Sequence, residues 1–429
     1  MGGYLLVSSL HRQAFASAAK HQLLAFLQVA AWTNRTAVMP YARVGEPAFV
    51  GSPSLAGFPD GGFVGLERYF DVADLKSRWP CLRMISYDAY LLERKTTVDY
   101  LVQLGFPPKF DGSVDAFGVS QNCGKRTRPL LALKAPFQCL TLAHATSALQ
   151  SLGPSNAQWK DAAVMVTNWN QRTVGVGDAT SPLFKDAFLN RGGCYKGRND
   201  SFPNLAQNWH DKASDFVASA LQKAPFVCAH FRAEKLASAA TGREKQSQWR
   251  PLQSPPAPGA ANEAFESPYM EMCIRDAAAI ARHFAGAHSL VLVSDMDARR
   301  GTPSNQGSAH FREWRGRGER LLRSALPEGV QFCSRGDEFN DPAECAVADA
   351  AVCRRARHVL RFGSGTFSEF LVGDGPGAPS STQFLNCSHM AAEARRLAEK
   401  PSKTGRGGRT FRNADQRGPA RGRRRRDAG

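Results

Sequence analysis

The stretch Pro225–Lys235, PFVCAHFRAEK, ends an apolar run with a histidine and an arginine two positions apart. Side chains two apart on a β-strand lie on the same face of the sheet, so His230 and Arg232 share a face where the strand leaves the core. Burying a guanidinium without an acidic partner is costly. We therefore expect Arg232 to meet either a carboxylate of the fold or an anionic ligand.

A glycine-rich turn follows a second predicted strand, in HVLRFGSGTFSEFLVG, residues 358–373. Glycines let backbone N–H groups approach an anion, and the start of a helix offers N–H donors without intrahelical partners. The hydroxyl groups of Ser364, Thr366 and Ser368 add donors for a phosphate. A capped helix after a glycine turn explains the same pattern without a ligand. Ligands of open α/β sheets bind at the carboxyl ends of strands, so the first motif strengthens the phosphate interpretation.

Two aspartates follow a third predicted strand in HSLVLVSDMDARRG, residues 288–301. An Asp-x-Asp pair, here Asp295 and Asp297, supplies hard oxygen ligands that can hold Mg²⁺ or Mn²⁺ against a sugar-nucleotide diphosphate. Aspartates at the end of a strand also commonly cap the following turn. The turn-capping interpretation is favoured, and no metal site is predicted.

Strand and helix patterns alternate on both sides of an irregular region, residues 150–210, which is rich in Asn, Gly and Asp. The chain opens with a β-α-β pattern, and a second α/β pattern begins at residue 225. We expect a helix from Ser267, opened by Pro268, and a strand at GVQFCS, residues 329–334. Such alternation predicts an α/β fold of two facing Rossmann-like domains with a cleft between them.

Length and composition support two domains in a protein of the ordinary globular class. The chain has 429 residues, of which 43% are hydrophobic, and no apolar run is long enough for a membrane-spanning helix. We place the N-terminal domain at 1–210 and the C-terminal domain at 211–390. The N-terminus lacks the layout of a signal peptide, and ten scattered cysteines permit disulfides without requiring them.

The net charge of +17 is concentrated at the C-terminus. Residues 391–429 hold thirteen Lys and Arg residues against four acids and almost no apolar side chains. Such a composition predicts a disordered Arg/Gly-rich tail. The tail could contact nucleic acid or an anionic membrane, but a solvated appendage is the favoured interpretation.

Several motifs together resemble the GDP-fucose-dependent O-fucosyltransferases, including their plant and algal relatives. The motifs occur in the family's order from about residue 3 to residue 373, with unmatched sequence between 100 and 220. They are YLLVSSLHRQ, AAWTNRTAVMP, RYFDVADLKSRWPCLRMISYDAYL, AHFRAEK, LVLVSDMD and AECAVADAAVCRRARHVLRFGSGTFSEFL.

The resemblance implies a GT-B fold and an inverting transfer of fucose from GDP-fucose to a hydroxyl of a protein Ser/Thr or of a glycan. No metal or other cofactor is expected. Arg232 would contact the diphosphate and stabilise the leaving group, and Glu234 is the candidate base. The nucleotide sugar would also be bound by residues from several motifs: His11, Arg12, His230, Asp295, Ser364, Thr366, Phe367 and Ser368.

The first loop departs from the family, because it reads Ser-Leu-His-Arg-Gln at residues 9–13 where Gly and an Asn-Gln pair are usual. Arg12 could supply charge there instead. An inactive, nucleotide-binding relative is therefore one alternative function. The others are a metal-dependent transferase built on Asp295 and Asp297 and a nucleic-acid-binding protein that acts through its tail. A monomer is expected, the donor could also carry rhamnose, and the family's Golgi or endoplasmic reticulum location lacks a targeting signal in this sequence.

Overall fold

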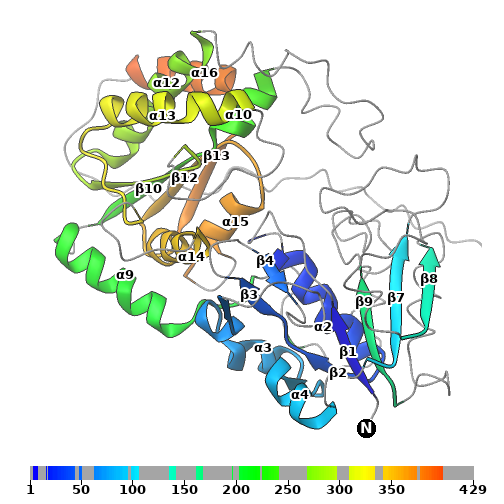
Figure 1. Cartoon of the computed structure of the whole chain (residues 1–429). Coiled ribbons are helices and arrows are strands. Elements are labelled where there is room, and N and C mark those ends of the chain that lie inside the picture. Colours follow the sequence, from blue (N-terminus) through cyan, green and yellow to red (C-terminus); the bar gives the residue numbers. More distant parts are fainter. Residues whose placement is uncertain are drawn as a thin grey trace, which may run out of the picture.

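The structure is a computed structural model of the whole chain, shown in Figure 1. It is an α/β fold built on two parallel sheets, one in each half of the chain. The residues it describes are 3–7, 16, 18–43, 48–50, 62–94, 98–105, 135–141, 161–167, 196, 202–222, 225–240, 268–296, 309–333, 342–373 and 377–399.

The sheet of the N-terminal half has six parallel strands in the order β6-β2-β1-β9-β7-β8. Alternation along β1 divides its side chains between two faces, as the period of a strand requires. Leu5 and Val7 join the core that contains α2, and Leu6 packs with Tyr87 and Tyr90 of α4 on the opposite face. The strands are β1 (Tyr4–Val7), β2 (Thr36–Val38), β6 (Met84–Ile85), β7 (Tyr100–Gly105), β8 (Phe137–Thr141) and β9 (Ala163–Thr167).

Helices and a small antiparallel sheet complete this half. The sheet has the order β4-β3-β5, with β3 (Tyr41–Arg43), β4 (Ala48–Val50) and β5 (Phe63–Val64). The helical segments are η1 (Ala18–Leu23), α2 (Leu24–Trp32), η2 (Leu66–Arg68), α3 (Val72–Arg78) and α4 (Tyr87–Arg94).

The sheet of the C-terminal half has four parallel strands in the order β11-β10-β12-β13. All six residues of β10 are buried, which is typical of a parallel strand that is covered on both faces. Val227, Ala229 and Phe231 face one core, and Phe226 and Cys228 face the other. The strands are β10 (Phe226–Phe231), β11 (Ser289–Ser294), β12 (His358–Phe362) and β13 (Ser380–Phe384).

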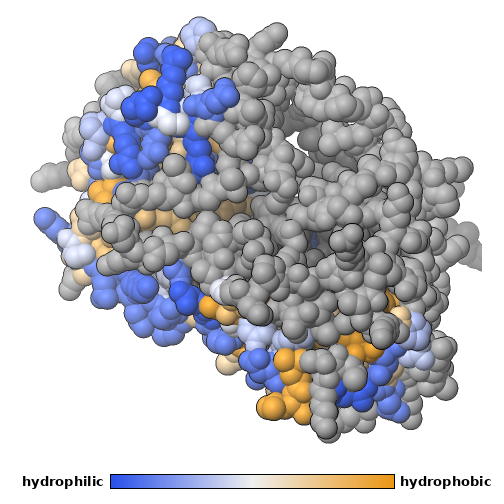
Figure 2. All heavy atoms as spheres, in the orientation of Figure 1, coloured by the Kyte–Doolittle hydropathy of each residue, from blue (hydrophilic) through white to orange (hydrophobic). Residues whose placement is uncertain are grey.

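Helices cover both faces of the second sheet (Figure 1). One face packs against α10 (Ala233–Ala240), α12 (Tyr269–Ala285), α13 (Ala309–Ala325) and α16 (Cys387–Ala398). The other face packs against α9 (Gln207–Ala220), α14 (Pro342–Cys353) and α15 (Thr366–Val372). Figure 2 shows hydrophilic side chains over the outer surface of α9 and of the helices at the top of the view, as amphipathic helices require.

The two halves pack directly against each other. One continuous core includes α2 of the N-terminal half together with α9, α14 and α15. Lys20 Nζ lies 3.1 Å from Glu369 Oε2, and the Phe202 and Phe370 rings meet edge to face at 5.2 Å. The Arg68 guanidinium also binds the Glu344 carboxylate, which is buried. The α15 helix is thus held by contacts from both halves.

The predicted α/β fold with two parallel sheets is confirmed, but the prediction missed one central strand. Residues 150–210 were expected to be irregular, yet β9 lies between β1 and β7 and its described side chains at 163–166 are fully buried. The run AAVMVT is short and apolar, and such runs carry no periodicity that separates strand from loop or helix.

Two further expectations are wrong. The predicted strand at GVQFCS forms only one β-bridge in the described residues, between Val330 and Val291. Residues 391–398, assigned to a disordered tail, belong to α16, whose Met390 and Leu397 are buried against the C-terminal core. Residues 400–429 and the predicted cap Ser267 lie outside the described residues.

The domain boundary at residue 210 stays a prediction, because α9 spans it and packs on α14. Among the described residues, no helix has the length and apolar character needed to cross a membrane.

Disulfides fasten the C-terminal half. Cys228 of β10 pairs with Cys353 of α14, Cys273 of α12 pairs with Cys387 of α16, and Cys333 pairs with Cys345. Cys81 of the N-terminal half is also disulfide-bonded. Within the described part of the chain, one of these bonds thus joins α14 to the sheet, and another joins α16 to α12 on the opposite face.

We expect loss of the Cys273–Cys387 bond to cost about 2–5 kcal/mol of unfolding free energy, because it closes a loop of 114 residues. The matched control is the Cys333–Cys345 bond, whose loop has 12 residues. In the chain-entropy model the longer loop is worth about 2 kcal/mol more. Urea denaturation of the two double Cys→Ala variants measures the difference. Equal losses would show that loop entropy does not govern these bonds.

Candidate functional site

Arg232 lies at the carboxyl end of β10, where the chain turns from strand to helix. Its backbone N–H donates to the Phe362 carbonyl of β12 at 2.8 Å, so the sheet ladder continues to this residue. The next residue, Ala233, begins α10. Parallel strands all present their carboxyl ends at one edge of the sheet, and the predicted ligand-binding edge is this one.

The Gly363–Gly365 turn leaves β12 beside Arg232. Both glycines adopt positive φ, +101° and +128°, a region that other residues rarely enter. A Cβ at Gly365 would lie 2.3 Å from Arg232 Nη1, and a Cβ at Gly363 would lie 3.0 Å from Arg232 Cβ. The arginine side chain therefore packs on the backbone of the turn, and two segments far apart in the chain meet as the sequence motifs predicted.

The Arg232 guanidinium is partly exposed and makes no hydrogen bond or ion pair with any residue that the structure describes. The described acid that interacts with it electrostatically is Asp295. Of the two partners expected for Arg232, no described carboxylate bonds it directly, so an anionic ligand stays the expected partner.

The Asp295 carboxylate binds the backbone at the start of α10. Its two oxygens accept hydrogen bonds from Ala233 N at 2.9 Å and Glu234 N at 3.2 Å. The predicted turn-capping role is thus close to what is found. The difference is that Asp295, which follows β11, caps α10, the helix that follows the neighbouring strand β10. Asp297 lies outside the described residues, and the described residues contain no group of three or more His, Cys, Asp or Glu that could hold a metal ion.

Burial raises the pKa of Asp295 from 3.8 to about 6, and Arg232 and the two amide hydrogen bonds offset part of that shift. Between about pH 4 and pH 6 the folded protein then holds a proton that the unfolded chain has lost. The free energy of unfolding should fall as pH rises through this window, by about 3 kcal/mol from this group alone.

The measurement is the difference between the stability–pH profiles of the native protein and the Asp295→Asn variant. Other carboxyl groups titrate in both proteins, so they drop out of the difference. Parallel profiles between pH 4 and pH 6 would contradict the raised pKa.

His230 is buried beneath the turn and is held by two residues of α15. Its Nδ1 lies 3.0 Å from Ser368 Oγ, and its ring meets the Phe367 ring edge to face with centroids 5.3 Å apart. Both His230 and Ser368 are essentially inaccessible. The Ser368 hydroxyl is thus engaged within the fold, where it orients the imidazole.

The other predicted residues lie around the same turn. Ser364, Thr366 and Phe367 are partly exposed, and Glu234 is in the first turn of α10 beside Arg232. His11 and Arg12 lie outside the described residues. Two basic residues were missed by sequence reasoning: Arg361, two residues before the turn, and Lys20, which binds Glu369 of α15. A charged residue in the middle of a buried strand was the available signal for Arg361.

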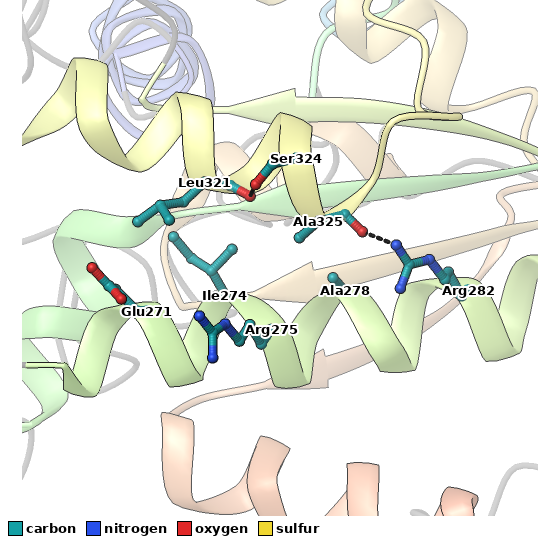
Figure 3. A pocket seen from close by; sticks show the side chains of 8 residues that line it. All are labelled: Glu271, Ile274, Arg275, Ala278, Arg282, Leu321, Ser324 and Ala325. Carbon is teal, nitrogen blue, oxygen red and sulfur yellow. Dashed lines mark hydrogen bonds between the residues drawn. The ribbon is translucent and has the colours of Figure 1, made fainter.

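Surface pockets away from this turn include two that are lined by described residues. One, of about 340 Å³, lies between α12 and α13 and is lined by residues such as Glu271, Arg275 and Arg282 (Figure 3). Arg282 spans it by donating a hydrogen bond to the Ala325 carbonyl. The other, of about 770 Å³, lies between the starts of α3 and α9. Neither pocket includes Arg232 or the Gly363–Gly365 turn.

Comparison with known proteins finds similarity in structure only. No protein-family model matches the chain, and no curated protein matches it. A solved structure of POFUT1 in complex with GDP has 15% identity and a TM-score of 0.48, over 89% of this chain and 98% of that one. POFUT1 with GDP-fucose has 14% identity and a TM-score of 0.47, over 89% and 98%. The fucosyltransferase NodZ from Bradyrhizobium has 11% identity and a TM-score of 0.36, over 86% and 93%.

The likeness is distant at these identities and TM-scores. A functional proposal therefore has to rest on the residues of the chain and their geometry.

Proposed function

We propose that the protein is an inverting glycosyltransferase that binds a nucleoside diphosphate sugar, with GDP-fucose as the leading candidate. The acceptor would be a hydroxyl group of a protein Ser/Thr or of a glycan. One observation carries the proposal: a partly exposed arginine, Arg232, rests on the Gly363–Gly365 turn at the carboxyl edge of a parallel sheet, and its guanidinium makes no hydrogen bond or ion pair with a described residue. The ordered sequence motifs support the choice of donor.

Arg232 would act on the diphosphate leaving group. A planar guanidinium donates two parallel hydrogen bonds to phosphate oxygens and offsets the negative charge that grows as the glycosidic bond breaks. The backbone of the turn packs against the Arg232 side chain, and Asp295 accepts a hydrogen bond from the backbone of the next residue, Ala233. His230, fixed by Ser368 and Phe367, supports the same edge of the sheet.

Glu234 is the proposed general base. Inversion needs one group that takes the acceptor's proton on the side opposite the leaving diphosphate. Glu234 is the second residue of α10, and its backbone N–H donates a hydrogen bond to Asp295. We expect Glu234→Gln to lower kcat while GDP binding stays unchanged. Weakened GDP binding would instead mean that Glu234 helps to position Arg232 and is not the general base.

The test of donor class is a thermal-shift panel of GDP-fucose, GDP-mannose, UDP-rhamnose and GDP. A ligand that binds only the folded state stabilises it by RT ln(1 + [L]/Kd), about 2.7 kcal/mol at a hundredfold excess over Kd. We expect GDP and GDP-fucose to raise Tm, and we expect no dependence on EDTA. Absence of any shift at millimolar nucleotide would overturn the proposal.

Turnover distinguishes an enzyme from an inactive relative. Hydrolysis or transfer of GDP-fucose by the purified chain supports the enzyme, whereas a thermal shift without turnover identifies a nucleotide-binding protein. Activity that EDTA abolishes and Mn²⁺ restores would favour the metal-dependent alternative.

A further inference from the structure

Arg361 is a second arginine at the edge of the sheet that carries Arg232. It lies on β12 directly opposite His230 of β10 in the parallel register. Its neighbour two residues earlier, Val359, faces the core that contains α14 and α15, so Arg361 lies on that same face. Its Nε is buried and has no hydrogen-bond partner, although the residue as a whole is only partly buried.

No described acid neutralises this guanidinium by direct contact. Burial lowers the pKa of Arg361, and the Glu369 carboxylate partly offsets that effect from a distance. Glu369 is already paired with Lys20, whose Nζ lies 3.1 Å from Glu369 Oε2. Arg361 makes no ion pair with any residue in the described part of the chain. A half-buried cation of this kind is costly unless an anion reaches it.

Arg361 lies on β12 and Arg232 directly follows the adjacent strand β10, and both interact with the segment from Gly365 to Glu369. Arg232 N–H donates to the residue that follows Arg361, and its guanidinium rests on Gly365, immediately before α15. Arg361 interacts electrostatically with Glu369 in the first turn of α15. The Lys20–Glu369 pair holds that turn from the N-terminal half.

We propose that Arg361 is a second anion-binding residue of this site, so that the site takes a ligand with two adjacent phosphate groups. The inference rests on the proposed function and makes it more specific. Two guanidiniums can each bind one of two adjacent phosphate groups, whereas a monophosphate offers only one such group. Arg361 would then determine that the enzyme binds a nucleoside diphosphate in preference to a nucleoside monophosphate.

The test compares GDP with GMP in the native protein and in Arg361→Met, which keeps the apolar stem and removes the charge. We expect the native protein to bind GDP more tightly than GMP, and Arg361→Met to weaken GDP binding about 10- to 100-fold with little effect on GMP. In the ligand-free protein the half-buried Arg361 guanidinium destabilises the folded state. The Tm of the ligand-free Arg361→Met variant should therefore stay unchanged or rise. The control is Arg357→Met, an exposed arginine immediately before β12 that contacts His288.

An unchanged ratio of GDP to GMP affinity in Arg361→Met would overturn the inference and leave the proposed function intact. If Arg361→Met fails to fold, Arg361→Lys serves instead, because it keeps the charge and loses the planar fork. An unchanged ratio in that variant also overturns the inference. Inorganic pyrophosphate is the second probe: if no nucleotide binds but pyrophosphate binds in an Arg361-dependent way, the proposed function fails and the two-phosphate site stands.

Discussion

Arg232→Ala is expected to lower kcat for GDP-fucose hydrolysis or transfer by about 10²–10³-fold, with the protein still folded. Removing one preorganised donor to a developing negative charge commonly has an effect of this size. The guanidinium makes no hydrogen bond or ion pair within the described part of the chain, so its loss removes no protein contact of that kind. Steady-state kinetics with GDP-fucose, together with Tm of both proteins, measures the effect.

Arg232→Lys is the graded variant, because it keeps a positive charge and loses the two-pronged geometry. We expect it to recover only part of the lost rate. Full activity in Arg232→Ala would remove this residue from the mechanism, whatever the fold resembles. A large fall in Tm would mean that Arg232 mainly stabilises the strand end.

Gly365→Ala is expected to remove most activity through Arg232, and also to destabilise the protein. A residue other than glycine at φ +128° is strained by about 1–3 kcal/mol. The added methyl group would lie 2.3 Å from Arg232 Nη1, so the guanidinium would have to move. The rate should therefore approach that of Arg232→Ala. Kinetics and urea denaturation of the same preparation separate the two effects.

Gly377→Ala is the matched control for backbone strain. Gly377 has φ +85°, and a Cβ there would meet nothing within 4 Å. We expect a loss of stability similar to that of Gly365→Ala without a loss of kcat. If both glycine variants lose stability and neither loses activity, the contact between the turn and Arg232 does not matter for function.

Local sequence patterns were sufficient for the elements that carry the site. The apolar runs that end at His230 and precede Gly363 were predicted as strands, and both are strands of one parallel sheet. Both motifs follow the carboxyl ends of strands, where ligands of open α/β sheets bind, so Arg232 and the glycine turn were expected to meet. The contact of Gly365 with Arg232 agrees with this expectation. The roles of these residues in catalysis stay predictions.

Other expectations failed where the answer depended on partners far away in the chain. The strand β9 was not predicted, because a short apolar run becomes a central strand only when β1 and β7 provide its ladders. Residues 391–398 of α16 were assigned to the tail because charged residues dominate the composition of residues 391–429. The burial of Met390 and Leu397 depends on the distant segments that form the C-terminal core.

The sequence by itself determined the class of fold and the residue types at the edge of the second sheet, because hydrophobic period and residue type are properties of short segments. Only the tertiary structure decided that Asp295 caps α10, that Ser368 is hydrogen-bonded to His230, and that Arg361 lies opposite His230 in the sheet. Strand order and packing bring these residues together from distant segments. A short segment of sequence does not show which acidic, hydroxyl or cationic side chains from other segments will lie next to it.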